Sequence, residues 1–356
     1  MIDIEDLAAQ VKRNCNISDA NHWGNYSLCG LLIRLREMYR AEHGIRPWEK
    51  VRQEDAGEWI TAREALWRQL EGKEYERIAV NGNVYGSFDV EQINAKLSEE
   101  GLIYGAGLGL HLKPSFFLAD LVSRERMEGF DVFTSGAEYA RDLSEYPAML
   151  QDGSIFARTE PTRLLLWQRF EEMRCKRTQC ALTFAFSKYG VSAEEEPSED
   201  VDRKISSIAR SEVETYIHHE LGEASEGERM GEQWKKLLAR LSHSRAELFS
   251  RSVKDILSDT SDRGMLSFIE ENRKEGSLGF YMAFLSGFRK VIFPEIVDAF
   301  RIFVETRDWQ GIEDARKRGY KKAEGYAGKL LSLYRNHKDD AALSGAIETE
   351  LLKGLL

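Results

Sequence analysis

The helical period of the second half of the sequence places the strongest limit on its fold. From about residue 161 onward, apolar side chains recur every three or four positions in nearly every segment. This spacing gathers them on one side of an α-helix, whereas a strand would need a two-residue period. Pro161 suits the first turn of the helix that opens this region. We therefore predict an all-α helical domain over residues 156–356.

The first half of the sequence mixes two periods. Helices are predicted over residues 28–42, 59–70 and 90–100, and residues 14–27 are predicted to be irregular and turn-rich. In residues 105–113 the period changes to two, which indicates a strand, and further strands are predicted at 116–122, 129–134 and 154–158. These patterns predict an α+β domain over residues 1–155 with a small antiparallel sheet. The whole chain is predicted to be mainly α.

Composition excludes several classes of protein. The 356 residues are 42% hydrophobic, which is enough for a sizeable core divided between two domains. The net charge is −10 and neither half is basic, so we expect no nucleic-acid partner. The longest fully apolar runs are only a few residues, so we expect no membrane span. Four cysteines do not make a disulfide scaffold and no signal-peptide pattern opens the chain, so we expect a cytoplasmic protein.

One predicted helix, over residues 201–223, carries metal-ligand side chains on its apolar side. At about 100° per residue, Glu212, His219 and Glu223 share a face with apolar residues. Carboxylates in that position are costly unless a metal ion or a buried counter-charge compensates them. Glu and His are ordinary ligands of iron, zinc and manganese. We predict that Glu212, His219 and Glu223 hold a divalent metal or a small polar ligand, with Tyr216 orienting a ligand or a water beside them.

Two known patterns are similar to this helix. The string from His219 to Glu223 resembles the HExxH helix of zinc proteases, but it ends in Glu where that motif has its second His, so protease activity does not follow. The spacing from Glu212 to His219 resembles the haem-oxygenase-like dimetal oxidases, in which Glu and His from several helices hold an iron pair. That resemblance covers a short stretch, and only Glu212 and His219 match it. The later His/Asp-bearing helix of that family has no counterpart here.

A buried ion-pair network is the alternative to a metal. Arg316 and Arg289 are candidate partners for Glu212 or Glu223, and either pairing would compensate the carboxylates without a metal. The chain would then be a non-catalytic interaction or assembly protein. Its aromatic helices over residues 280–303 would build a core or a contact between copies of a homo-oligomer. Both hypotheses stay open at this point.

A weaker candidate site lies near the N-terminus. Cys15, His22 and Cys29 are spaced by seven residues and have zinc-ligand chemistry, and a fourth ligand would have to come from His43 or His111. The paired Cys-x2-Cys knuckles of zinc ribbons are absent, so the alternative is that the cysteines are small buried hydrophobes. No motif in the sequence names a reaction.

Overall fold

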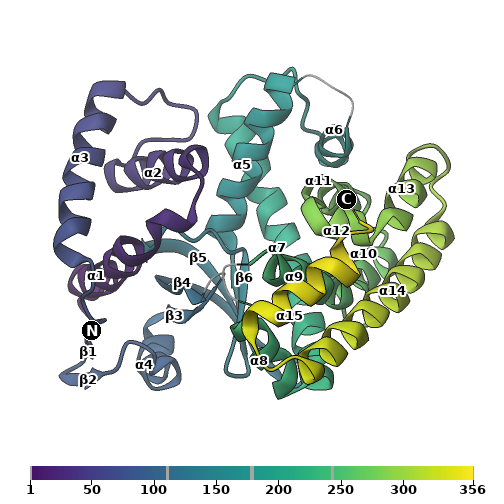
Figure 1. Ribbon diagram of the computed structural model, residues 1–356. Helices are drawn as coiled ribbons and strands as arrows, with labels where there is room; N and C mark the ends of the chain where they lie inside the picture. Colours follow the sequence, from purple (N-terminus) through teal and green to yellow (C-terminus); the bar gives the residue numbers. More distant parts are fainter. Residues whose placement is uncertain (1, 110–111, 177–179, 242–243, 356) are drawn as a thin grey trace. The chain divides into compact units, whose positions relative to one another are not determined.

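The computed structural model describes residues 2–109, 112–176, 180–241 and 244–355, and it divides into two compact units. The first unit comprises Met1–Glu171 and Glu195–Val213, and the second comprises Glu172–Glu194 and Glu214–Leu356. The predicted fold class is confirmed, because in the described ranges helices dominate, sheets occur only in the N-terminal half and the C-terminal region is helical (Figure 1). The predicted domain boundary between residues 155 and 156 stays a prediction.

The first unit combines helices with two sheets. Its complete helices are α1 (Ile4–His22), α2 (Leu28–His43), α3 (Gln53–Leu70) and α4 (Val90–Leu97), with short 3-10 turns at Trp23–Asn25 and Ser98–Glu100. It also holds most of α5 (Thr159–Lys176) and the first part of α7 (Glu199–Met230). A two-stranded antiparallel sheet is formed by β1 (Ile78–Val80) and β2 (Asn83–Tyr85).

The larger sheet has five strands in the order β3-β4-β5-β7-β6. The strands are β3 (Leu102–Leu108), β4 (Pro114–Met127), β5 (Phe130–Arg141), β6 (Ala148–Gln151) and β7 (Ser154–Arg158). All neighbours pair antiparallel except β5 and β7, which pair parallel, so the sheet is mixed and not purely antiparallel. Helix α1 packs on β4 and β5, and the core between them contains Leu7, Val11 and Phe116.

The prediction that residues 14–27 are irregular was wrong over its first part, because α1 continues to His22. The polar residues that suggested a loop point inward and bond the chain around them. The Asn14 amide donates to the Glu76 carbonyl at 2.8 Å, the Ser18 hydroxyl donates to the Pro114 carbonyl, and an Asp19 carboxylate oxygen accepts from the Leu143 amide at 3.1 Å. Buried polar groups with partners are stable in a helix, so polarity did not mark a turn here.

The second unit is helical throughout its described residues. Besides the ends of α5 and α7 it contains α6 (Ala181–Ser187), α8 (Glu232–Arg240), α9 (Arg245–Thr260), α10 (Met265–Glu271), α11 (Glu275–Phe284), α12 (Gly287–Ile292), α13 (Pro294–Thr306), α14 (Trp309–Asn336) and α15 (Asp340–Ile347), followed by a π-turn at Glu348–Leu352. Helix α9 packs against α14, α12 and α10. Phe249, Phe293 and Phe303 are fully buried in the core of this unit.

A stripe of small residues lets α14 approach α13 closely, side by side as Figure 1 shows. Ala315, Gly319 and Ala323 are buried on this stripe. A Cβ atom at Gly319 would lie only 2.4 Å from the ring of Phe293, so only glycine fits there.

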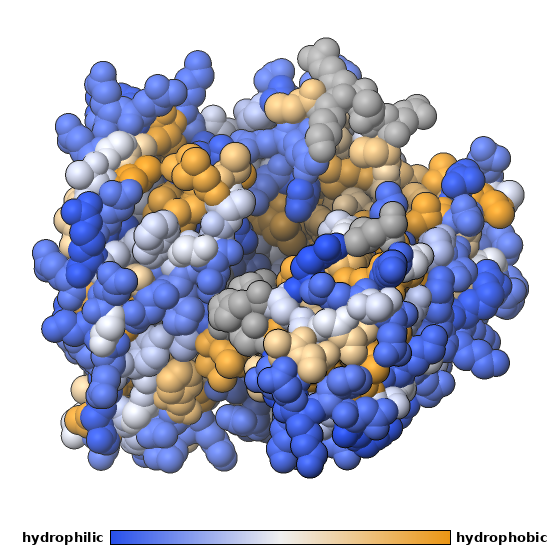
Figure 2. Space-filling view, viewed as in Figure 1, coloured by the Kyte–Doolittle hydropathy of each residue, from blue (hydrophilic) through white to orange (hydrophobic). Residues whose placement is uncertain are grey.

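The surface of the first unit carries some apolar side chains. Figure 2 shows hydrophobic residues over α2, where Leu28, Leu32 and Ile33 are exposed. Among the helices of the described residues, none has the length and apolar character needed to cross a bilayer.

Candidate metal centre

Within the second unit, the later part of α7 and helix α9 come close enough to share polar side chains because of a glycine. A Cβ atom at Gly222 would lie 2.3 Å from the carbonyl oxygen of Ser258, near the end of α9. Only a residue without a side chain allows this approach. Gly222 directly precedes Glu223 in the sequence, so the close contact sets the distance between the ligand-type residues of α7 and the carboxylates of α9.

His219 is oriented by a buried carboxylate. Its Nδ1 lies 2.6 Å from Oδ1 of Asp259, whose side chain is 1% exposed. Its Nε2 faces Glu223, one turn further along α7, at 3.9 Å from Oε2. Burial by itself would lower the pKa of His219, but the charge of Asp259, helped by Glu220 and Glu223, outweighs burial and raises this pKa to about 10. Without a metal, His219 is therefore an imidazolium ion among carboxylates.

Asp255 of α9 completes a group of three ligands. The donor atoms of His219, Glu223 and Asp255 all lie within 4.8 Å of one another, and each side chain is partly buried. Burial, together with the negative charges of Asp259 and Glu223, raises the pKa of Asp255. The pKa of Glu223 is lowered, because the positive charges of Lys254 and His219 outweigh its burial. Negative charge is thus crowded at this point.

Two further helices bring polar groups to the same place. Arg289 of α12 is half-buried, and although burial lowers its pKa, the charges of Asp259 and Asp255 outweigh this and raise it. The pKa of Tyr281 of α11 is raised well above its usual value by burial and by the charge of Asp259. Within the described part of the chain, the Tyr281 hydroxyl and Oδ2 of Asp259 are buried without a partner in hydrogen-bond geometry.

The structure groups the residues of α7 differently from the sequence prediction. His219 and Glu223 meet, but Glu212 is not a member of the ligand group. Glu212 lies seven residues before His219, which is about 10 Å along the helix axis. Glu212 is 3% exposed and belongs to the first unit, whereas His219 belongs to the second. Tyr216 lies on α7 within the second unit and influences the pKa of Arg289.

The two proposed arginine partners also differ. Arg289 interacts electrostatically with Asp259 and Asp255, which raise its pKa. Arg316 bonds elsewhere: its guanidinium donates to Glu313 at 2.6 Å and to the Thr260 carbonyl at 2.6 Å, and it lies 3.1 Å from Asp262. It therefore does not compensate Glu212 or Glu223. The aromatic residues Phe280, Phe300 and Phe303 are buried in this unit, and the idea of a homo-oligomer stays a prediction.

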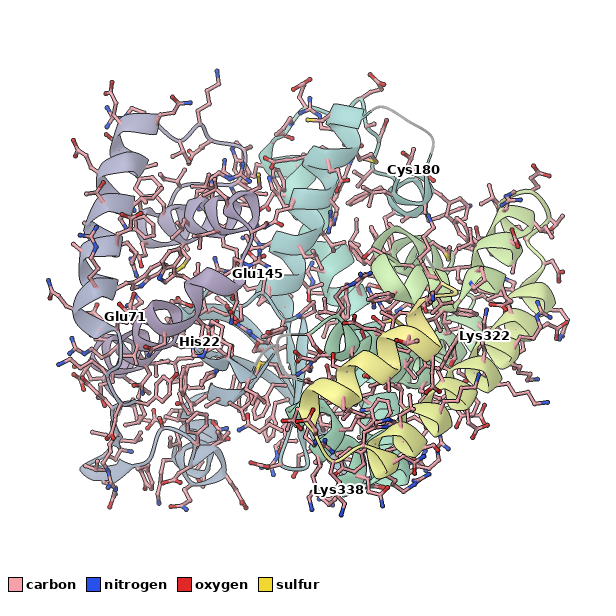
Figure 3. All side chains as sticks on the ribbon, viewed as in Figure 1. His22, Glu71, Glu145, Cys180, Lys322 and Lys338 are labelled. Atoms are coloured by element: carbon pink, nitrogen blue, oxygen red, sulfur yellow. The ribbon has the colours of Figure 1, made fainter. Side chains whose placement is uncertain are left out.

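The weaker N-terminal site is not assembled in the structure. Cys15 is buried in α1, and its thiol donates to the Phe116 carbonyl at 3.3 Å. His22 lies at the end of the same helix (Figure 3), with Nδ1 2.9 Å from the Ser18 carbonyl, and Cys29 is exposed on α2. No ligand group in the described ranges contains any of them. His111, a suggested fourth ligand, lies outside the described residues.

The family of the chain is defined by two adjacent matches. Residues 6–158 match the N-terminal domain, and residues 163–353 the C-terminal domain, of a family of unknown function, DUF6866. The chain belongs to this family. No curated protein and no solved structure shows significant similarity to it. The candidate metal centre lies within the part of the chain that matches the DUF6866 C-terminal domain.

Sequence reasoning missed the contribution of α9. Asp255 and Asp259 are one helical turn apart, and Asp259 is buried beside Ile256 and Leu257. A polar ligand-type residue at an apolar position of a helix was the same signal that marked His219 and Glu223 on α7. Gly222 was a second signal, because a glycine within a helix often marks a close approach of two backbones.

Proposed function

We propose that the second unit binds one divalent transition-metal ion through His219, Glu223 and Asp255. The convergence of their donor atoms within 4.8 Å, from two helices, is the observation that carries this proposal. Around an ion with bonds of about 2.0–2.2 Å, tetrahedral ligand atoms lie about 3.3–3.6 Å apart, so small side-chain movements are enough to close the site.

The surroundings of His219 support the proposal. A metal-bound imidazole usually donates its other ring N–H to a carboxylate, which fixes the ring and its tautomer. Asp259 stands in that position, 2.6 Å from Nδ1, and this leaves Nε2 for the ion. One imidazole and two carboxylates suit zinc, iron(II) or manganese. Three protein ligands leave a further position for water or a small ligand.

The ion-pair hypothesis is favoured by one specific contact, between the ammonium of Lys254 and the carboxylate of Glu223. A metal must displace this ammonium from Glu223 and the proton from Nε2 of His219. The two hypotheses therefore differ in what removal of Lys254 does. If the site binds metal, Lys254→Met frees a ligand and strengthens metal binding. If the site is only an ion-pair network, the substitution changes stability and creates no metal affinity.

The test is calorimetric titration of EDTA-treated protein with Zn²⁺ and with Mn²⁺, with the metal content measured afterwards by elemental analysis. We expect one equivalent of metal to bind. His219→Ala and Asp255→Asn should abolish saturable binding, and Asp259→Asn should weaken it about 10–100-fold, the usual effect of removing a group that orients a ligand.

The neighbouring residue His218 provides a matched control. Its ring stacks on Phe268, with centroids 4.1 Å apart, and it is not a member of the ligand group. His218→Ala should leave metal binding unchanged. Absence of stoichiometric binding to the wild-type chain, or equal losses in His218→Ala and His219→Ala, would contradict the proposal.

A further inference from the structure

The first unit contains a cavity of about 460 Å³, within the range of small-molecule sites. Its wall is formed by α1, α2, α3, β5 and α5, by the first turn of α7 and by the loop after α2. Six cationic and four carboxylate side chains line it, so the cavity is locally positive in a chain of net charge −10. The cations are Lys12, Arg40, Arg46, Arg63, Arg141 and Arg163.

Two of these arginines are fully engaged by the protein. Arg63 donates to Asn16 at 2.7 Å and to both carboxylate oxygens of Glu42. Arg163 pairs with Glu160 at 2.7 Å and with Asp202 at 2.6 Å. Their N–H groups are used in holding the wall together, and they leave little binding capacity for a ligand.

Arg141 and Arg40 bond to the protein less completely than Arg63 and Arg163 do. The side chain of Arg141, at the end of β5, is 11% exposed, and within the described ranges its contacts are long: 3.5 Å to the Glu37 carbonyl and 4.0 Å to Glu138. Arg40 of α2 contacts Glu37 and the Glu49 carbonyl, each at 3.1 Å, but its Nε is buried with no partner among the described residues. A buried guanidinium with unused N–H groups is costly unless something accepts from it.

An apolar surface lies beside these donors. Met38, Ile45 and Pro47 line the same cavity. These three side chains give the carbon skeleton of a small organic ligand an apolar surface beside the polar groups that would orient it. Planar guanidinium groups match the geometry of carboxylate and phosphate oxygens.

We propose that this cavity binds a small organic anion, whose carboxylate or phosphate group is held by Arg141 and Arg40 while its carbon skeleton lies on Met38, Ile45 and Pro47. The site belongs to the first unit and goes beyond the metal binding proposed for the second. The two sources of the oxyanion, carboxylic acid and phosphate, share the same recognition and are separated by the choice of probe.

The test is calorimetric titration of the full chain with succinate and, separately, with inorganic phosphate. We expect saturable one-to-one binding of at least one probe. Arg141→Gln should weaken binding about tenfold or more, since a hydrogen bond to a charged group contributes roughly 1.5–3 kcal/mol. Arg141→Lys keeps the charge and loses the planar guanidinium, so its affinity for the anion should lie between those of the wild type and Arg141→Gln. The stronger probe identifies the class of anion.

Arg141 is the residue to change because its contacts with the protein are long. Arg126→Gln is the matched control: Arg126 lies on β4 in the same unit, and its side chain is 71% exposed. An unchanged circular dichroism spectrum and melting temperature would show that Arg141→Gln remains folded. Failure of both probes to bind the wild-type chain, or equal weakening by Arg126→Gln and Arg141→Gln, would overturn the proposal.

Discussion

Substitution of Lys113 by methionine should destabilise the first unit strongly. Lys113 is 2% exposed, and its ammonium lies 3.1 Å from Asp19, 3.0 Å from Asp142 and 3.1 Å from the hydroxyl of Ser144. Both carboxylates are fully buried. Methionine keeps most of the volume and removes the charge, so two buried carboxylates would lose their shared counter-ion.

The expected loss is about 3–5 kcal/mol of unfolding free energy, the usual effect of removing one partner of a buried ion pair. Protonation of Asp19 can relieve only part of this repulsion. Its pKa in the folded chain is already raised to about 6, so protonating it at pH 7 costs about 1.4 kcal/mol, since each pKa unit corresponds to about 1.36 kcal/mol. The larger part of the expected loss therefore comes from Asp142, whose pKa the charge of Lys113 helps to lower and which would stay buried without its counter-ion.

Urea denaturation followed by tryptophan fluorescence would measure the change. Lys96→Met is the control, because Lys96 is exposed on α4 and its loss should change stability by no more than about 0.5 kcal/mol. In an Asp19→Asn background, Lys113→Met should cost less, because one carboxylate fewer is left without a counter-ion. A loss of about 1 kcal/mol or less, the range of a surface ion pair, would refute the reasoning.

Three further predictions concern other parts of the molecule. Burial outweighs the charge of Lys113 and raises the pKa of Asp19 from 3.8 to about 6. The folded chain therefore favours the protonated carboxyl of Asp19. The stability that this proton contributes is complete below pH 3.8 and is lost as the pH rises through 6. Asparagine does not ionise, so Asp19→Asn should not show this loss. In urea titrations, the unfolding free energy of the variant minus that of the wild type should rise by about 3 kcal/mol from pH 3.5 to pH 7. A difference that stays constant with pH would contradict this prediction. Gly319→Ala should lower the unfolding free energy by about 1–3 kcal/mol, because the new methyl group would clash with Phe293. Gly325→Ala, on the same helix, should be neutral or stabilising, because a Cβ atom there would have nothing within 4 Å. Equal melting temperatures of the two variants would contradict this prediction. The three exposed cysteines should react with a thiol reagent in the native protein, and Cys15, whose pKa burial raises, only after unfolding; reaction of Cys15 in the native chain would show that α1 opens.

The fold class could be predicted from the sequence because it depends on local periodicity. The strand at Ser154–Arg158 and the helix ending at Leu70 occur where the pattern of apolar residues placed them. The end of α1 could not be predicted in this way. Its polar residues are satisfied by partners distant in sequence, such as the Leu143 amide that binds Asp19, and no local pattern records such a contact.

The glycines of β3 and the residues that follow it show the same limit. In the strand predicted over residues 105–113, glycine recurs at every second position from Gly105 to Gly109. In the structure a Cβ atom at Gly105 would lie 2.0 Å from the ring of Phe117, and one at Gly109 would lie 2.2 Å from the Tyr146 hydroxyl. The missing side chains make room for aromatic rings, one of them on the neighbouring strand β4. The need for glycine was visible in the sequence, but the group that requires it was not.

The candidate metal centre shows how far one helix can be interpreted alone. The apolar face of α7 singled out His219 and Glu223, which the structure brings together because residues one turn apart on a helix adjoin. It also singled out Glu212, which shares the angle around the helix but lies about 10 Å further along its axis. The angle around one helix therefore does not show which of its residues meet. In the group that the structure brings together, the third ligand-type residue comes from α9, which Gly222 allows to approach closely, so Gly222→Ala should abolish Zn²⁺ binding with every proposed ligand still present.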